Sequence, residues 1–121
     1  MLVNPGVFSS TPRVFSRCIS RVTDDPKILY NIVSAYQSRD LSSIAASFMN
    51  DLETAAMELR PEIKTAKEAL TACGVSGALM SGSGSTVFGL VPSEDEGLEI
   101  ASSLRAEGYS VWCVETYCPV V

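Results

Sequence analysis

The sequence predicts an α+β fold, in which helices pack on one face of a four-stranded, mainly antiparallel sheet. Two observations lead to this prediction. Apolar residues recur at helical spacing through the first half of the chain, and two short apolar runs, residues 77–80 and 86–91, then flank a glycine- and serine-rich turn that is typical of a hairpin. At 121 residues the chain can bury a conventional core, so we expect one domain over residues 1–121.

A short strand and a short helix open the chain. Leu2-Val3 form the strand, which ends in a proline-glycine turn. Thr11 is the expected N-cap of the helix, and Pro12 is its expected first helical residue. The apolar side chains of this helix share one face, and they are Val14, Phe15, Cys18 and Ile19.

Three further helices are predicted before the hairpin. The first of them begins with the acidic pair before Pro26 and carries an apolar stripe over residues 28–36. The strongest periodicity in the chain predicts one continuous helix over residues 40–59. The third opens at Pro61 and stops at Gly74.

Beyond the hairpin, the sequence predicts one more helix and one more strand. Ser93 and Glu96 form the capping box of the helix, which Gly108 ends. Alternating apolar residues from Val111 then predict a strand that runs on to Glu115. The order is one strand, four helices, two strands, one helix and one strand.

The composition excludes several classes of function. The net charge is −5 and no basic cluster occurs, which argues against binding to the phosphate backbone of nucleic acids. Histidine is absent, which excludes histidine-activated nucleophiles and imidazole ligands. No apolar run approaches the roughly 18 residues of a membrane span, and no signal peptide is recognisable. We therefore expect no nucleic-acid partner and no membrane partner.

The four cysteines are widely spaced, and none forms a C-x-x-C pair. Without histidine they do not match the ligand patterns of a zinc site, so we expect no metal site. Cys73 follows an apolar helical stretch and Cys113 alternates with hydrophobic residues, as buried free thiols do in a reducing compartment. The cysteines therefore favour a cytoplasmic protein.

The hairpin turn is the first candidate site. Its two glycines allow positive φ, so consecutive N–H groups can converge on an anion such as phosphate, with the hydroxyl groups as further donors. A plain flexible turn has the same composition, and the residues alone favour it, because no lysine is near and no helix follows. The candidate residues are Ser81, Gly82, Ser83, Gly84, Ser85 and Thr86.

Phe15 is the second candidate. An aromatic residue one turn into a short helix usually packs in the core, and burial tendencies favour that interpretation. The alternative is a platform on which a planar ligand such as a nucleobase stacks. The acidic residues 94–96 complement a helix dipole, so no catalytic residue is assigned.

Two motifs resemble a known family. The run from Gly77 to Leu90 closely resembles the third signature motif of the GHMP kinases, which include galactokinase, homoserine kinase, mevalonate kinase and phosphomevalonate kinase. The segments from Val3 to Gly6 and from Ser10 to Phe15 resemble a family branch that phosphorylates a cytidine diphosphate sugar alcohol in non-mevalonate isoprenoid synthesis. The resemblance covers nearly the whole chain but only the C-terminal half of the family's length. It implies a ferredoxin-like plait, the C-terminal domain of a two-domain enzyme.

The resemblance implies that the catalytic functions are divided between two domains. The complete enzyme transfers the γ-phosphoryl group of Mg-ATP to the 2-hydroxyl group of its small-molecule substrate, with an aspartate as base. The residues that hold ATP and Mg would belong mainly to an N-terminal domain that is missing from this chain. We therefore expect no tightly bound cofactor here, and no activity from this chain alone.

The resemblance also implies roles for the candidate residues. The loop Ser81–Thr86 would line the floor of the cleft and buttress the phosphate loop of the other domain, and Ser85, where relatives commonly carry proline, implies a less rigid loop. Thr11 and Pro12 match positions that border the cytidine. Phe15 matches an aromatic residue that stacks on the cytosine ring, which reverses its interpretation as a core residue.

Two alternatives stay open, another GHMP small-molecule kinase and a stand-alone ferredoxin-like module for ligand binding or assembly. The coding sequence upstream of Met1 would separate them. A fragment would expose the face that meets the missing domain, including the hairpin loop and part of Leu2-Val3. We therefore expect this chain to form a homo-oligomer.

Overall fold

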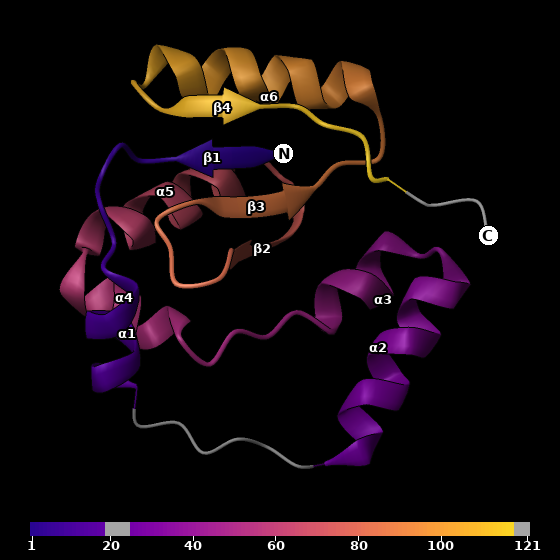
Figure 1. Ribbon diagram of the computed structural model, residues 1–121. Coiled ribbons are helices and arrows are strands. Elements are labelled where there is room, and N and C mark those ends of the chain that lie inside the picture. Colours follow the sequence, from indigo (N-terminus) through magenta and orange to yellow (C-terminus); the bar gives the residue numbers. More distant parts are fainter. Residues whose placement is uncertain (19–24, 118–121) are drawn as a thin grey trace.

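The computed structural model describes residues 1–18 and 25–117. Four strands form one antiparallel sheet in the order β2-β3-β1-β4 (Figure 1). They are β1 (Leu2–Asn4), β2 (Ser76–Met80), β3 (Val87–Leu90) and β4 (Ser110–Trp112). The α+β class and the antiparallel sheet are confirmed, and the alternation of strands and helices follows the ferredoxin-like plait.

The described residues contain six helices. They are α1 (Thr11–Arg17), α2 (Pro26–Ser38), α3 (Leu41–Ala46), α4 (Glu53–Leu59), α5 (Pro61–Ala72) and α6 (Glu94–Ala106). Figure 1 shows α5 behind the strands and α6 alongside β4. Helix α4 packs against α1 and α5, whereas α2 packs against α3.

The core lies between the sheet and helices α5 and α6. Val3, Val87 and Val111 enter it from three neighbouring strands, and each is at most 4% exposed. Ile63 and Leu70 of α5 are fully buried against them. The helix predicted to open at Pro61 is confirmed.

The other face of the sheet carries a row of partly covered apolar residues. Leu2 pairs with both Phe88 and Trp112, and paired residues point to the same face. Phe48 covers part of this row. The centroid of its ring lies 5.1 Å from that of the Phe88 ring, in an edge-to-face arrangement. Trp112 remains 50% exposed.

The continuous helix predicted over residues 40–59 is wrong. Helix α3 ends at Ala46, and α4 begins only at Glu53. Between them the Asn50 side chain accepts a hydrogen bond from the Leu52 N–H group and donates to two carbonyl groups near the end of β2. Because a short amide side chain competes with helical hydrogen bonds, these contacts outweigh the local periodicity.

The predicted start of the first helix shifts by one residue. Ser10 is the N-cap, in extended conformation, and Thr11 is already helical. The Thr11 hydroxyl is therefore not a cap and bonds to Ser83 instead. The predicted boundaries at Pro26, Ser93, Gly74 and Gly108 are confirmed, and both of these glycines have positive φ.

Three other expectations need correction. The apolar stripe of α2 is largely solvent-exposed, with Leu29, Val33 and Tyr36 between 46% and 67% exposed. Strand β4 ends at Trp112, so Glu115 lies outside it. Val3 belongs to an inner strand that is paired on both sides and is fully buried, so it adds nothing to an exposed surface.

The described cysteines are free thiols. Cys18, Cys73 and Cys113 are each half-buried, whereas Cys118, like Ile19, lies outside the described residues. Burial, and secondarily the charge of Glu107, raises the pKa of Cys73 above its ordinary value. Over residues 1–18 and 25–117, no helix is both long and apolar enough to cross a bilayer.

Candidate functional site

The glycine loop, residues Ser81–Thr86, is a compact turn between β2 and β3. The Ser81 N–H group donates to the Thr86 carbonyl at 2.9 Å, and the Gly84 N–H group donates to the Ser81 carbonyl at 3.0 Å. Gly82 and Gly84 have φ of 55° and 89°, where a side chain is disfavoured. Two loop amides are therefore engaged inside the loop, and the anion-binding role remains a prediction for the others.

The segment that leads into α1 braces this loop. Ser9 donates from its hydroxyl to the Ser83 carbonyl at 2.6 Å, and the hydroxyls of Thr11 and Ser83 are 2.7 Å apart. Asn4, at the end of β1, donates from Nδ2 to the Thr86 hydroxyl at 3.0 Å. The structure thus brings two groups of predicted site residues, the start of α1 and the loop, into direct contact.

Packing holds the second half of the loop. A Cβ atom added to Gly84 would lie 2.9 Å from Ile63 Cδ1, which is shorter than real Cβ contacts, and 3.1 Å from Met80 Sδ, which is tighter than most of them. Ser85 is only 7% exposed. By contrast, a Cβ atom at Gly82 would meet nothing within 4 Å. The looser loop expected from Ser85 remains a prediction.

Phe15 is not a core residue, and the interpretation from burial tendencies is wrong. It is 59% exposed, whereas its neighbour Val14 is fully buried. Thr11 and Phe15 are four residues apart in α1, so they lie on the same face of the helix. The face of α1 that meets the glycine loop therefore presents an accessible aromatic ring one turn further on. Pro12 is also exposed.

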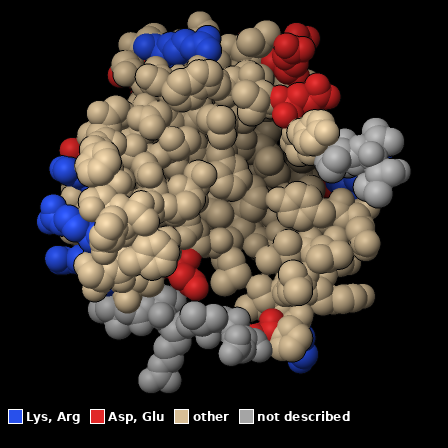
Figure 2. All heavy atoms as spheres, in the orientation of Figure 1, with Lys and Arg blue, Asp and Glu red and all other residues tan. Residues whose placement is uncertain are grey.

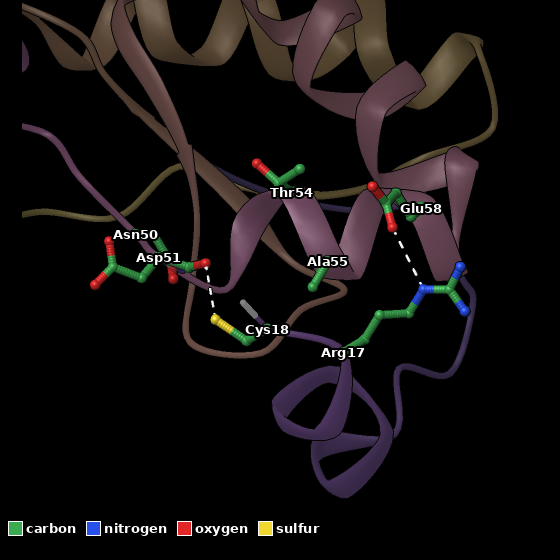
Figure 3. A pocket seen from close by; sticks show the side chains of 7 residues that line it. All are labelled: Arg17, Cys18, Asn50, Asp51, Thr54, Ala55 and Glu58. Atoms are coloured by element: carbon green, nitrogen blue, oxygen red, sulfur yellow. Dashed lines mark hydrogen bonds and ion pairs between the residues drawn. The ribbon is translucent and has the colours of Figure 1, made fainter. Parts of the chain in front are cut away.

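A cavity of about 640 Å³ lies between α1 and α4 (Figure 3). Arg17 Nε and Glu58 Oε2 form an exposed ion pair across it at 3.3 Å, and Cys18 donates from Sγ to the Asp51 carbonyl at 3.4 Å. Its lining residues are Arg17, Cys18, Asn50, Asp51, Thr54, Ala55 and Glu58. Helix α1 thus borders the glycine loop at its start and this cavity at its end.

Asn50 and Glu53 also contact the loop region, and sequence reasoning missed them. Asn50 donates from Nδ2 to the carbonyls of Met80 and Gly82, each at 2.8 Å. Glu53 Oε2 accepts from the Met80 N–H group at 2.8 Å, while Oε1 pairs with Lys67 of α5. Both lie inside the wrongly predicted helix. The signal available was the Asn-Asp dipeptide, since such residues favour turns and caps over helix interiors.

The surface is mostly uncharged in the middle of the face that Figure 2 shows, with charged side chains gathered towards its rim. Within the described ranges, no three cysteine, aspartate or glutamate side chains converge as metal ligands. Whereas the cavity carries the charged side chains of Arg17, Asp51 and Glu58, the loop and the exposed ring offer neutral hydrogen-bonding groups and an aromatic platform. Such groups suit a polar, planar ligand better than an ion alone.

Comparison with known proteins gives a consistent result. The model of the family "GHMP kinases C terminal" matches residues 32–110. The 4-diphosphocytidyl-2-C-methyl-D-erythritol kinase of Thermobifida fusca (strain YX) is 38% identical over 121 residues, which cover 98% of this chain and 39% of that protein. The kinase of the same name from Syntrophus aciditrophicus (strain SB) is 33% identical over 117 residues, with 96% and 40% covered.

Solved structures agree with the sequence matches. A crystal structure of 4-(cytidine 5'-diphospho)-2C-methyl-D-erythritol kinase superimposes with a TM-score of 0.66 at 31% identity, over 87% of this chain and 38% of that one. A homoserine kinase from Cytophaga hutchinsonii superimposes with a TM-score of 0.68 over 90% of this chain and 38% of that one, but at 21% identity it shows the fold alone. The chain spans about two fifths of the length of the curated relatives described above.

Proposed function

The chain belongs to the GHMP kinase family, and we propose that it is the C-terminal domain of a 4-diphosphocytidyl-2-C-methyl-D-erythritol kinase. The whole enzyme would transfer the γ-phosphoryl group of ATP to the 2-hydroxyl group of a cytidine diphosphate sugar alcohol in isoprenoid precursor synthesis. The observation that carries the proposal is the contact between Thr11 and Ser83, since it joins the glycine loop to the helix that exposes Phe15. Relatives of that name, alignable over nearly the whole chain, support it.

The described residues fit a supporting role towards ATP and magnesium. Hydroxyl and N–H groups of the loop suit contact with phosphate oxygens or with a phosphate-binding loop. The carboxylate beside the loop, Glu53, is already engaged by Met80 and Lys67, so it is poorly suited to bind a metal ion. We therefore assign ATP and Mg²⁺ mainly to an N-terminal domain, whose Mg-ATP would supply the transferred phosphoryl group.

This chain's own residues would act on the substrate. Thr11 and Pro12 would border the cytidine, and Phe15 would stack on the cytosine ring. The glycine loop would form the floor of the cleft and keep the phosphate loop of the other domain in place. Because no catalytic base is assigned to this chain, we expect it to be inactive alone; turnover of ATP and substrate by the isolated chain at the rate of a full-length relative would refute this.

Replacing Phe15 with alanine tests the substrate assignment. In the enzyme that also contains the N-terminal domain, loss of stacking should raise the KM for the cytidine substrate about 5- to 150-fold, with little change in kcat. Tyr36→Ala is the matched control, because Tyr36 is a similarly exposed aromatic residue on α2, at 56% against 59%. Equal KM values for the two variants would favour another GHMP kinase, such as one acting on homoserine or mevalonate.

The stand-alone module remains the alternative from another class. Under that proposal, Phe15 and the glycine loop would serve a ligand that does not donate a phosphoryl group. An in-frame glycine- and serine-rich phosphate loop upstream of Met1 would support the kinase. A natural start codon at Met1 beside an unrelated gene would support the module. The free thiols of the described cysteines support a reducing, cytoplasmic location under either proposal.

A further inference from the structure

The segment that leads from α3 into the first residue of α4 holds the glycine loop through contacts separate from those of α1. We propose that Asn50 and Glu53 are positioning residues, which fix the glycine loop in the conformation that supports phosphoryl transfer. Only the link to phosphoryl transfer rests on the proposed function. The clamp itself rests on the contacts of these two side chains.

Asn50 uses every polar atom of its amide group. Nδ2 donates to the carbonyls of Met80 and Gly82, which flank Ser81, and Oδ1 accepts from the Leu52 N–H group. An amide has two N–H donors on one atom and an acceptor on the other, so a single side chain can bridge both carbonyls and still accept from the Leu52 N–H group in the turn before α4. An aspartate can do the second task but not the first.

Glu53 completes the contact with Met80. Its Oε2 accepts from the Met80 N–H group at 2.8 Å, and its Oε1 pairs with Lys67. The Glu53 side chain is only 17% exposed, and hydrogen bonds to a carboxylate are stronger than those between neutral groups. The ion pair with Lys67 anchors the clamp to α5, which packs on the sheet.

The position of Met80 in the sheet explains why the clamp is needed. Strand β2 is at the edge of the sheet, and the Ser81 N–H group bonds to Thr86 on the neighbouring chain segment. Because backbone groups alternate in direction along an antiparallel strand, the N–H and carbonyl groups of Met80 point away from β3. Asn50 and Glu53 occupy the place of a missing neighbouring strand.

Gly82 depends on the clamp more than Gly84 does. Gly84 is enclosed by Ile63, Met80 and Ser9, whereas a Cβ atom at Gly82 would have no neighbour within 4 Å. Packing therefore fixes the second half of the loop, and the hydrogen bond from Asn50 to the Gly82 carbonyl fixes the first half. Without it, a glycine with wide conformational freedom would be held only by its chain neighbours.

Asn50→Asp separates the two hydrogen bonds to the loop carbonyls from the hydrogen bond with Leu52. The carboxylate can still accept from Leu52 but faces two carbonyls without a proton to donate. In this chain, we expect hydrogen exchange to accelerate about tenfold or more at the amides of Ser81 and Gly84, the two that are hydrogen-bonded within the loop. The amides of β1 and β4 should change less than about twofold. Asn31→Asp, the same change at an exposed residue of α2, is the control and should change neither group.

Two further variants guard against misfolding and test the charge. Asn50→Ser can still accept from the Leu52 N–H group but cannot bridge both carbonyls, so it should loosen the loop even if Asn50→Asp does not fold. Glu53→Gln keeps an acceptor for the Met80 N–H group, so it should accelerate amide hydrogen exchange in the loop less than Glu53→Ala does. If both Asn50 variants fold and the loop amides still exchange their hydrogens at the wild-type rate, the proposal that Asn50 holds the loop is overturned.

The link to catalysis has its own measurement. In the enzyme with its N-terminal domain, Asn50→Asp should lower kcat about tenfold or more and leave the KM for the cytidine substrate within about twofold, the reverse of the pattern for Phe15→Ala. A loosened loop with unchanged kcat would overturn the positioning role. If the wild-type enzyme does not phosphorylate the cytidine substrate, the proposed function fails, and the exchange rates alone decide the clamp.

Discussion

The two glycines of the loop offer a matched pair for measuring how tightly it is packed. Both have positive φ, so alanine at either position is strained by its backbone conformation. Only Gly84 is also crowded, with Ile63 Cδ1 2.9 Å and Met80 Sδ 3.1 Å from the site of an added Cβ atom. Comparing Gly84→Ala with Gly82→Ala therefore separates packing from backbone strain.

The expected magnitudes follow from these two contributions. A non-glycine residue in the left-handed region costs about 1–2 kcal/mol, and reduced freedom of the unfolded chain offsets about 0.4–1 kcal/mol of it. Gly82→Ala should therefore lower the free energy of unfolding by about 1 kcal/mol. Overpacking adds about 1–3 kcal/mol at Gly84, so Gly84→Ala should lower it by about 3 kcal/mol.

Urea denaturation of this chain measures the difference. With a slope of about 1–3 kcal/mol per molar urea, the two midpoints should differ by about 1 M. Ile63→Val removes the Cδ1 atom that Gly84→Ala would strike, so the double variant should lose less stability than the sum of the two single variants. Equal midpoints for the two alanine variants, or strictly additive losses in the double variant, would refute the packing argument.

Two further outcomes are expected. Burial raises the pKa of Cys73, so its thiolate fraction at neutral pH is low. Iodoacetamide should therefore label Cys73 more slowly than it labels a thiol in an unfolded peptide, at a rate that rises with pH. Labelling at the rate of the peptide thiol would contradict the burial of Cys73. The exposed apolar stripe of α2, with Leu29, Val33 and Tyr36, should make this chain self-associate, and Val33→Glu should weaken that association; sedimentation as a clean monomer at high concentration would contradict it.

Local signals in the sequence were sufficient for most of the fold. Helix starts marked by Pro26, Pro61 and Ser93 and stops marked by Gly74 and Gly108 are where they were predicted. Each such signal depends on groups within a few residues, such as a side chain that caps the next turn. Sequence alone is therefore informative where the interactions that decide the structure join residues close together in the chain.

Asn50 shows where local reasoning fails. Periodicity predicted that it lies within one long helix, because the apolar residues around it repeat at helical spacing. The groups that decide its conformation, the carbonyls of Met80 and Gly82, are about thirty residues away in the chain. No window around Asn50 contains them, and both Asn50 and Glu53 were therefore missed as site residues.

Phe15 and Thr11 depend on the same kind of distant contact. Helix α1 has only seven residues, and two turns are too few for periodicity to decide whether Val14 or Phe15 faces the core. The hydrogen bond between the hydroxyls of Thr11 and Ser83 spans 72 residues and sets which side of the helix meets the loop. Since Phe15 is one turn beyond Thr11 on that side, the contact that makes Thr11 a loop residue also keeps the aromatic ring out of the core, on the side of α1 that meets the loop.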